Sequence, residues 1–105
     1  MVENSYLYRL TLLPPFDKEA NWTDEAVQLR NNHFEYLVKL KDKGKIILVG
    51  RTDVALDHPG NTGICIFKAD DIDEAKQIAA NDPAVMGNLM KAEVLPFKVV
   101  LKESN

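Results

Sequence analysis

The sequence contains a single cysteine, Cys65, so the chain cannot form an internal disulfide. This cysteine lies within an apolar run, where we expect a small buried hydrophobic side chain. Long apolar runs are missing too, since stretches such as Ile46 to Val49 are far too short to span a bilayer. The N-terminus, MVENSYLYRL, lacks the basic start, apolar stretch and small-residue cleavage site of a secretion signal. Together these absences predict a cytoplasmic protein with no membrane partner.

Basic residues are neither in excess nor clustered. The 13 lysines and arginines are spread along the chain against 16 acidic residues, which gives a net charge of -3, so we expect no nucleic-acid partner. The glycines between residues 49 and 63 match neither a phosphate-binding loop nor a dinucleotide fingerprint. No serine or cysteine lies in a recognised nucleophile motif. Asp53, Asp57 and His58 do not have the spacing of known metal ligands, so we expect neither a metal nor another cofactor.

The patterns that are present predict one α+β domain over residues 1–105, a length that suits a single core. Four segments are rich in strand formers: Ser5 to Leu13, Lys45 to Thr52, Gly63 to Ala69 and about Ala92 to Leu101. Two segments show helical spacing, from Thr23 to a stop at Gly44 and from about Asp71 to the residue before Pro83, after which a short turn, helical or not, leads into the last strand. The order βαββαβ predicts the ferredoxin-like arrangement, with a four-stranded antiparallel sheet and two helices on one face.

The expected sheet is apolar on both faces, although two helices can cover only one. The expected opposite faces are Tyr6, Tyr8, Leu10 and Leu12 against Leu7, Arg9, Thr11 and Leu13, then Ile46 and Leu48 against Ile47 and Val49, then Ile64 and Ile66 against Cys65 and Phe67. A sheet with one wet face normally alternates between apolar and polar residues. Because a bare apolar patch of this size is unfavourable on a monomer, we expect a homodimer through the open sheet face. The alternative is a twisted sheet whose tyrosines face water.

His33 falls on the apolar side of the first predicted helix, facing the sheet or a cleft beside it. It is either a buried neutral imidazole with one hydrogen bond or a general acid or base, since histidine ordinarily titrates near pH 6.5. Arg30, three residues earlier, lies on the same side, where it could bind a carboxylate with two hydrogen bonds or extend to solvent. Asn31 and Asn32 are poor helix-interior residues, so the helix could instead begin at Asn32. His33 would then lie in the first turn, where the helix dipole favours a neutral imidazole.

Asp82 directly precedes Pro83, a common pairing at the start of a helix. In the predicted topology the first helix starts at the end of the molecule where the second helix stops. His33 and Asp82 could therefore face each other there. A carboxylate beside an imidazole orients the ring and stabilises its protonated form.

The stretches LRNNHFEYLVKLKDKGKIILVGRTD and GICIFKADDIDEAKQIAANDPAVMGNLMKAEVLPFKVV together resemble the YciI-like (YCII-related) proteins. The shared details are an arginine three residues before a histidine, a glycine between helix and strand, and an Asp-Pro after the second helix. The resemblance covers about residues 28–100. It implies a dimeric α+β barrel with a catalytic His–Asp pair in a cleft, which would be His33 and Asp82 with Arg30 beside them. Relatives include chloromuconolactone dehalogenase-like enzymes and, in the wider fold, muconolactone isomerases.

The chain departs from the family pattern in three places. Asn31 and Arg51 stand where the family often has proline, and the loop from Pro14 to Trp22 is longer than usual. That loop is either a lid over the cleft or a surface decoration. These differences leave the His–Asp pair in place, but they do not allow a relative's substrate to be carried over.

We therefore expect a small cofactor-independent enzyme that moves a proton next to a carbonyl group. Its substrate would be a small anionic metabolite, a carboxylate or a lactone, with a lyase, isomerase or dehalogenase outcome. His33 would be the base or acid, Asp82 its orienting partner and Arg30 the ligand of the anion, with Arg9 or Arg51 assisting. Two alternatives predict the same fold: a non-catalytic dimeric module that binds such a metabolite, and a protein that only dimerises.

Overall fold

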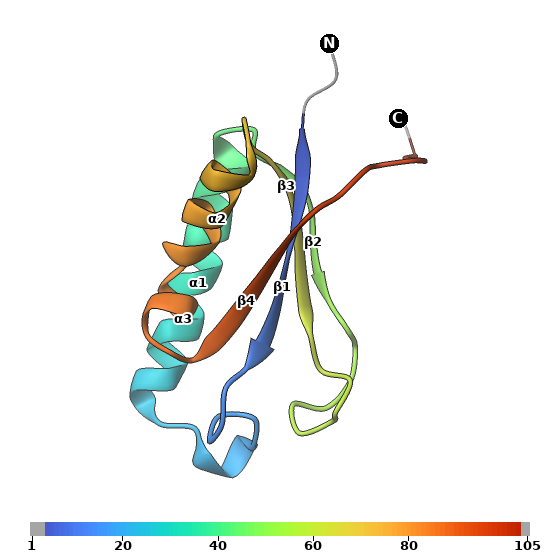
Figure 1. Ribbon diagram of the computed structural model, residues 1–105. Coiled ribbons are helices and arrows are strands. Elements are labelled where there is room, and N and C mark those ends of the chain that lie inside the picture. The colour runs from blue at the N-terminus through green and yellow to red at the C-terminus, as the bar shows by residue number, and fades with distance from the viewer. Residues whose placement is uncertain (1–3, 104–105) are drawn as a thin grey trace.

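The structure is a computed structural model that describes residues 4–103. Its elements are β1 (Ser5–Leu12), η1 (Glu19–Asn21), α1 (Asp24–Asp42), β2 (Ile46–Arg51), β3 (Gly63–Lys68), α2 (Ile72–Ala80), α3 (Pro83–Met86) and β4 (Met90–Pro96). The four strands pair antiparallel in the order β2-β3-β1-β4, and the α-helices lie on one face of the sheet (Figure 1). The predicted α+β, ferredoxin-like subunit is therefore confirmed. Among residues 4–103, no helix is long and apolar enough to cross a membrane.

Helix α1 is continuous from the predicted cap at Thr23 to the predicted stop at Gly44. The side chain of Thr23 caps its first turn, and Gly44 follows its last turn with a φ of 75°, a conformation that favours glycine. The alternative start at Asn32 is wrong, because Asn32 lies inside the helix and accepts a hydrogen bond from the Gln28 amide at 2.9 Å. His33 therefore lies beyond the first turn, and the argument from the helix dipole does not apply to it.

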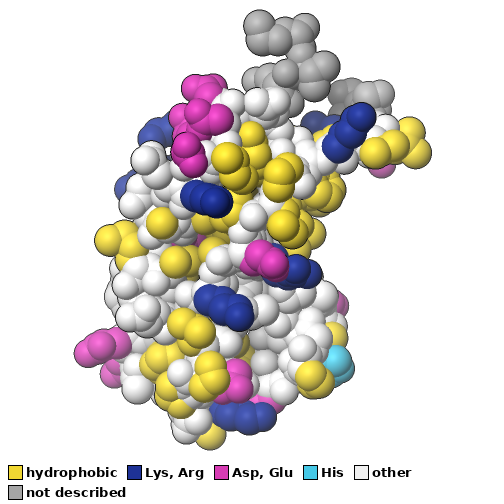
Figure 2. All heavy atoms as spheres, in the orientation of Figure 1, with side chains coloured by type: hydrophobic (Ala, Val, Ile, Leu, Met, Phe, Trp, Pro, Cys, Tyr) yellow, Lys and Arg dark blue, Asp and Glu magenta, His cyan; other side chains and the backbone are white. Residues whose placement is uncertain are grey.

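Strand β4 is shorter than the predicted strand over residues 92–101. Its last backbone link is the hydrogen bond from Phe97 N to Ser5 O, at 3.0 Å. Because β1 begins at Ser5, the residues after Phe97 have no neighbouring strand to pair with among those described. Figure 2 shows hydrophobic side chains at the end of this segment, standing away from the body of the subunit. β4 is an edge strand, which is the position in a sheet where a proline such as Pro96 is tolerated.

A β-bulge between Ile46 and Leu48 changes which residues of β2 face the helices. Ile46 and Val49 pair with Phe67 and Cys65, both of which are buried beneath the helices, whereas Leu48 lies on the open face. The prediction that Ile46 and Leu48 share one face is therefore wrong, because nothing in the sequence marks the extra residue. The bulge turns Val49 toward the space between the sheet and α1.

Two apolar clusters hold the helices on the sheet. The larger one lies between the sheet and helices α1 and α2, where the Tyr8 and Phe67 rings meet edge to face with centroids 5.4 Å apart. The smaller one joins α1, α3 and the 14–22 loop. At Gly87, just after α3, a Cβ atom would lie 2.6 Å from the Leu29 side chain, so any larger residue would force that side chain to move. The end of α3 is thereby packed closely against α1.

Candidate active site

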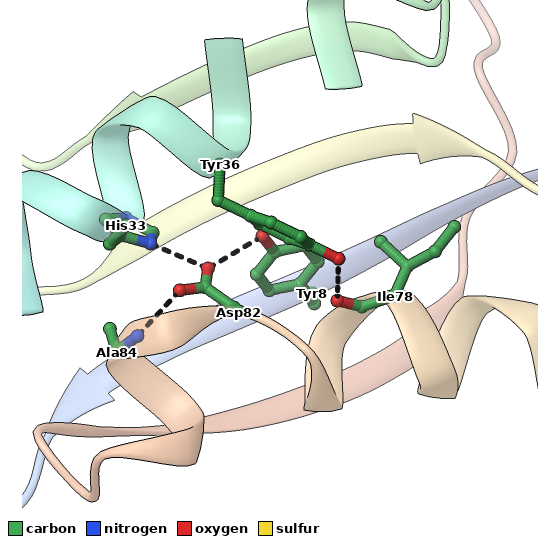
Figure 3. A network of polar contacts seen from close by, with 6 residues as sticks. All are labelled: Tyr8, His33, Tyr36, Ile78, Asp82 and Ala84. Carbon is green, nitrogen blue, oxygen red and sulfur yellow. Dashed lines mark hydrogen bonds and ion pairs between the residues drawn. The ribbon is translucent and has the colours of Figure 1, made fainter. Parts of the chain in front are cut away.

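Asp82 is the N-cap of α3, as predicted, and its buried carboxylate has three hydrogen-bond partners (Figure 3). The His33 ring nitrogen Nδ1 lies 2.6 Å from Oδ2. The Tyr8 hydroxyl donates to the same oxygen at 3.0 Å, and the Ala84 backbone N–H donates to Oδ1 at 2.9 Å. The structure therefore brings together His33 and Asp82, which lie 49 positions apart in the sequence.

The arrangement around Asp82 selects one form of the His33 ring. A buried carboxylate that already accepts from Tyr8 and Ala84 favours an N–H at Nδ1, because burial without donors is costly for a charge. The second ring nitrogen, Nε2, has no hydrogen-bond partner among residues 4–103. With Nδ1 protonated, Nε2 is the unprotonated nitrogen that can accept a proton.

Tyr8 is a member of this network that sequence reasoning missed. Its side chain is fully buried on β1, beneath the helices. Burial, and then the charge of Asp82, raise the pKa of Tyr8 well above its ordinary value of 10.0, so it stays a neutral donor. A buried tyrosine hydroxyl needs a hydrogen-bond acceptor, and this was the sequence-level reason to expect a partner for Tyr8. The same reason applies to any tyrosine on the helix-covered face of β1.

The change Tyr8→Phe is expected to lower the free energy of unfolding by about 1.5–3 kcal/mol, the typical contribution of a hydrogen bond to a charged group. The ring stays in place, so the loss comes from the hydroxyl alone. Urea unfolding at neutral pH measures it. Tyr6→Phe is the matched control, because the Tyr6 hydroxyl makes no hydrogen bond among residues 4–103. Equal losses in the two variants would contradict the assignment.

The stability of Tyr8→Phe should also depend on pH differently from that of the wild type. In the unfolded chain the Tyr8 phenol ionises near its ordinary pKa of 10.0, whereas in the folded protein its pKa is raised. Stability from Tyr8 is therefore fully present below about pH 10 and is lost as the pH rises further. We expect the free energy of unfolding to fall less steeply above pH 10 in Tyr8→Phe than in the wild type.

A cavity of about 870 Å³ lies between α1, the sheet and the β2–β3 loop. His33 lines it from α1, and Val49 and Cys65 line it from the sheet. The His33 side chain is 14% exposed, while Asp82 behind it is fully buried. The imidazole therefore reaches the cavity, and the carboxylate contacts the imidazole from the buried side.

Two of the three predicted arginines also line this cavity. Arg30 reaches it from α1 and Arg51 from the end of β2, and both side chains are exposed. Arg9 does not: it lies on the opposite face of the sheet, where its guanidinium donates to Glu93. Residues next to each other on a strand point to opposite faces, so Arg9 must point away from the helices when Tyr8 points toward them. Arg9 therefore lies outside the lining of this cavity.

Cys65 is buried at the cavity wall and is not suited to nucleophilic chemistry. Burial is the largest influence and raises the pKa of its thiol to about 12, so little thiolate forms at neutral pH. Its predicted role as a small buried side chain agrees with this placement. Within residues 4–103, no group of three or more histidine, cysteine, aspartate or glutamate side chains could hold a metal ion. His58 lies on the exposed β2–β3 loop and accepts from the Gly60 backbone N–H at 2.8 Å.

The fold has a counterpart among solved structures. The chain is similar to 5-chloro-2-hydroxyhydroquinone dehydrochlorinase (TftG) from Burkholderia phenoliruptrix AC1100, in a complex with 2,5-dihydroxybenzoquinone. The TM-score is 0.65 at 21% sequence identity, over 90% of this chain and 93% of that one. At this identity the similarity shows the fold. No curated protein matches the sequence.

The sequence itself matches a protein family over most of its length. Residues 11–98 match the YCII-related domain, and this range includes His33, Asp82 and both arginines at the cavity. It extends further toward the N-terminus than the resemblance over residues 28–100 and takes in the 14–22 loop. The chain belongs to the YCII-related domain family.

Proposed function

We propose that the protein is a cofactor-independent acid–base enzyme acting on a small anionic metabolite in the cavity beside His33. The observation that carries the proposal is the 2.6 Å contact of His33 with a fully buried carboxylate, made by an imidazole that also lines a cavity. A histidine that only filled core space would be expected to bury both ring nitrogens, whereas His33 lines a cavity and its Nε2 has no hydrogen-bond partner among residues 4–103. The similarity to a dehydrochlorinase is consistent with this chemistry but shows only the fold.

In the proposed reaction, Nε2 of His33 takes a proton from a carbon next to a carbonyl group. The electron pair of that C–H bond moves onto the carbonyl oxygen, and Asp82 stabilises the imidazolium that forms. His33 then returns the proton to another carbon, which is an isomerase outcome. In the dehalogenase outcome a halide leaves with its bonding electrons and His33 releases the proton to water. Arg30, with Arg51, binds the anionic group of the substrate.

Proton abstraction can be tested without knowing the product. The protein is incubated in D₂O with lactones, 2-oxo acids and the chlorinated hydroxyquinol that TftG is named for, and deuterium uptake and halide release are followed by NMR and ion chromatography. We expect at least one compound to exchange or react in a His33-dependent manner. Binding with neither exchange nor turnover would favour the alternative of a non-catalytic metabolite-binding module.

We further propose that a second copy of the chain covers the open sheet face. Leu7 pairs with Ile66 on one side and Leu95 on the other, and Ile66 pairs with Leu48, so one apolar row crosses all four strands. Leu48 and Leu95 are 54% and 40% exposed, and no helix covers this face (Figure 1). A matching row from a second copy would bury these side chains.

The change Leu48→Glu is expected to convert a dimer into a monomer, because it places a charge within the apolar row that the proposed interface would bury. Analytical ultracentrifugation across a concentration series measures the mass. Met86→Glu is the matched control, since Met86 is 68% exposed on α3, away from this face. A wild-type protein that sediments as a monomer at all concentrations would refute the proposed pairing.

A further inference from the structure

Trp22, the single tryptophan of the chain, lines the cavity. Its indole N–H donates to the Phe16 carbonyl oxygen at 2.8 Å, and the two rings meet edge to face with centroids 6.5 Å apart. It also packs against the smaller apolar cluster between α1 and α3. The indole is thus held from several directions, although it lies in a loop.

Arg30 rests on this indole. Its guanidinium carbon is 5.7 Å from the centre of the Trp22 ring, within the range of a cation–π contact. Among residues 4–103, Arg30 has no hydrogen bond or ion pair, so its N–H donors are available. Trp22, Arg30 and His33 line the same cavity. Glu35, on the same helix, is the acidic residue among those that line it.

The segment that carries Trp22 is tied to the β2–β3 loop, of which Leu56 and Asn61 also line the cavity. The Glu19 backbone N–H donates to the Asp57 carboxylate on the β2–β3 loop at 2.8 Å. Figure 1 shows this segment and that loop at the same end of the subunit. Asn21 holds the segment in shape by donating from its amide to the Pro15 carbonyl oxygen at 3.0 Å. These contacts fix the 14–22 loop in a shape that places an aromatic ring beside an arginine with no hydrogen bond or ion pair among residues 4–103.

We propose that Trp22 is a positioning residue for anion binding: its ring holds the Arg30 guanidinium at the cavity wall, where Arg30 binds the negatively charged group of a ligand whose apolar part lies toward His33. This inference rests on the proposed function and assigns a role to the 14–22 loop. A side chain as mobile as arginine loses conformational freedom when it binds an anion. An aromatic support reduces that loss, and it also adds the cation–π attraction.

The test compares benzoate with benzamide, its uncharged counterpart of nearly the same shape, by calorimetric titration. Trp22→Leu is expected to weaken benzoate binding by about two- to fivefold, which is the effect of losing an exposed cation–π contact. Benzamide binding should be unchanged, and Trp22→Phe should lie between wild type and Trp22→Leu for benzoate. In an Arg30→Met background, the change Trp22→Leu should have no further effect on benzoate, because the group that it positions is gone.

A merely structural role for Trp22 gives a different pattern. Equal weakening of benzoate and benzamide, or an effect of Trp22→Leu that persists in Arg30→Met, would overturn the proposal. So would a wild-type protein that does not discriminate benzoate from benzamide. Arg30 is exposed, so Arg30→Met is expected to fold, and thermal melts check every variant. Turnover does not enter this test, so a failure of His33-dependent exchange in D₂O would overturn the proposed function separately.

Discussion

Replacing His33 with glutamine is expected to lower kcat/KM by about 10²- to 10⁴-fold, the usual contribution of a positioned general acid or base. Glutamine is chosen because its amide N–H can still donate to Asp82, so the buried carboxylate keeps a partner. The side chain then has no group that can exchange a proton near neutral pH. The measurement is kcat/KM on whichever compound the wild-type protein turns over.

His58→Gln is the matched control for this change. His58 is the other histidine of the chain, and it lies on an exposed loop outside the lining of the cavity. We expect this variant to keep wild-type activity and His33→Gln to keep most of its stability. An active His33→Gln protein, or equal losses in the two variants, would be incompatible with proton transfer by His33.

The change Asp82→Asn is expected to lower kcat/KM by a similar factor, about 10²- to 10⁴-fold, while leaving the protein folded. The asparagine oxygen can still accept from the Ala84 backbone N–H, so α3 keeps its cap. In the wild type, His33 Nδ1 and the Tyr8 hydroxyl both contact the carboxylate oxygen Oδ2. In the variant, the amide N–H₂ group takes the place of that oxygen. The imidazole must turn Nδ1 into an acceptor and carry its proton on Nε2, so it presents no basic nitrogen to the cavity.

Asp71→Asn separates this effect from capping. Asp71 caps α2 by accepting from the Glu74 backbone N–H at 2.8 Å, and it has no histidine partner. Both variants exchange a capping aspartate for asparagine, which is an equally good cap. We expect Asp71→Asn to be fully active. An Asp82→Asn protein with wild-type kcat/KM would show that the carboxylate does not orient a catalytic imidazole.

The parts of the fold that depend on local signals could be predicted from the sequence. The Thr23 cap and the Gly44 stop define α1, and Pro83 together with Asp82 defines the start of α3. Once the order of elements is known, the ferredoxin-like topology brings the end of α2 near α1. The contact between His33 and Asp82 follows from that topology together with helical periodicity.

The remaining features depend on packing between segments far apart in the sequence. The bulge in β2 reverses the faces of Leu48 and Val49, and no residue type marks it. The partner of Tyr8 could not be named before α3 was placed above β1. Arg9 is a different case, because the alternation along β1 already placed it opposite Tyr8. It therefore cannot reach the helix-covered side of the sheet where Tyr8 and the cavity lie.

The ¹⁵N NMR spectrum of the neutral His33 ring tests the central claim most directly, because it reports which nitrogen carries the proton. We predict a protonated Nδ1 bound to the carboxylate and an unprotonated Nε2 whose resonance moves when benzoate enters the cavity. A proton on Nε2, or a His33 ring whose signals do not respond to any ligand of the cavity, would contradict the account.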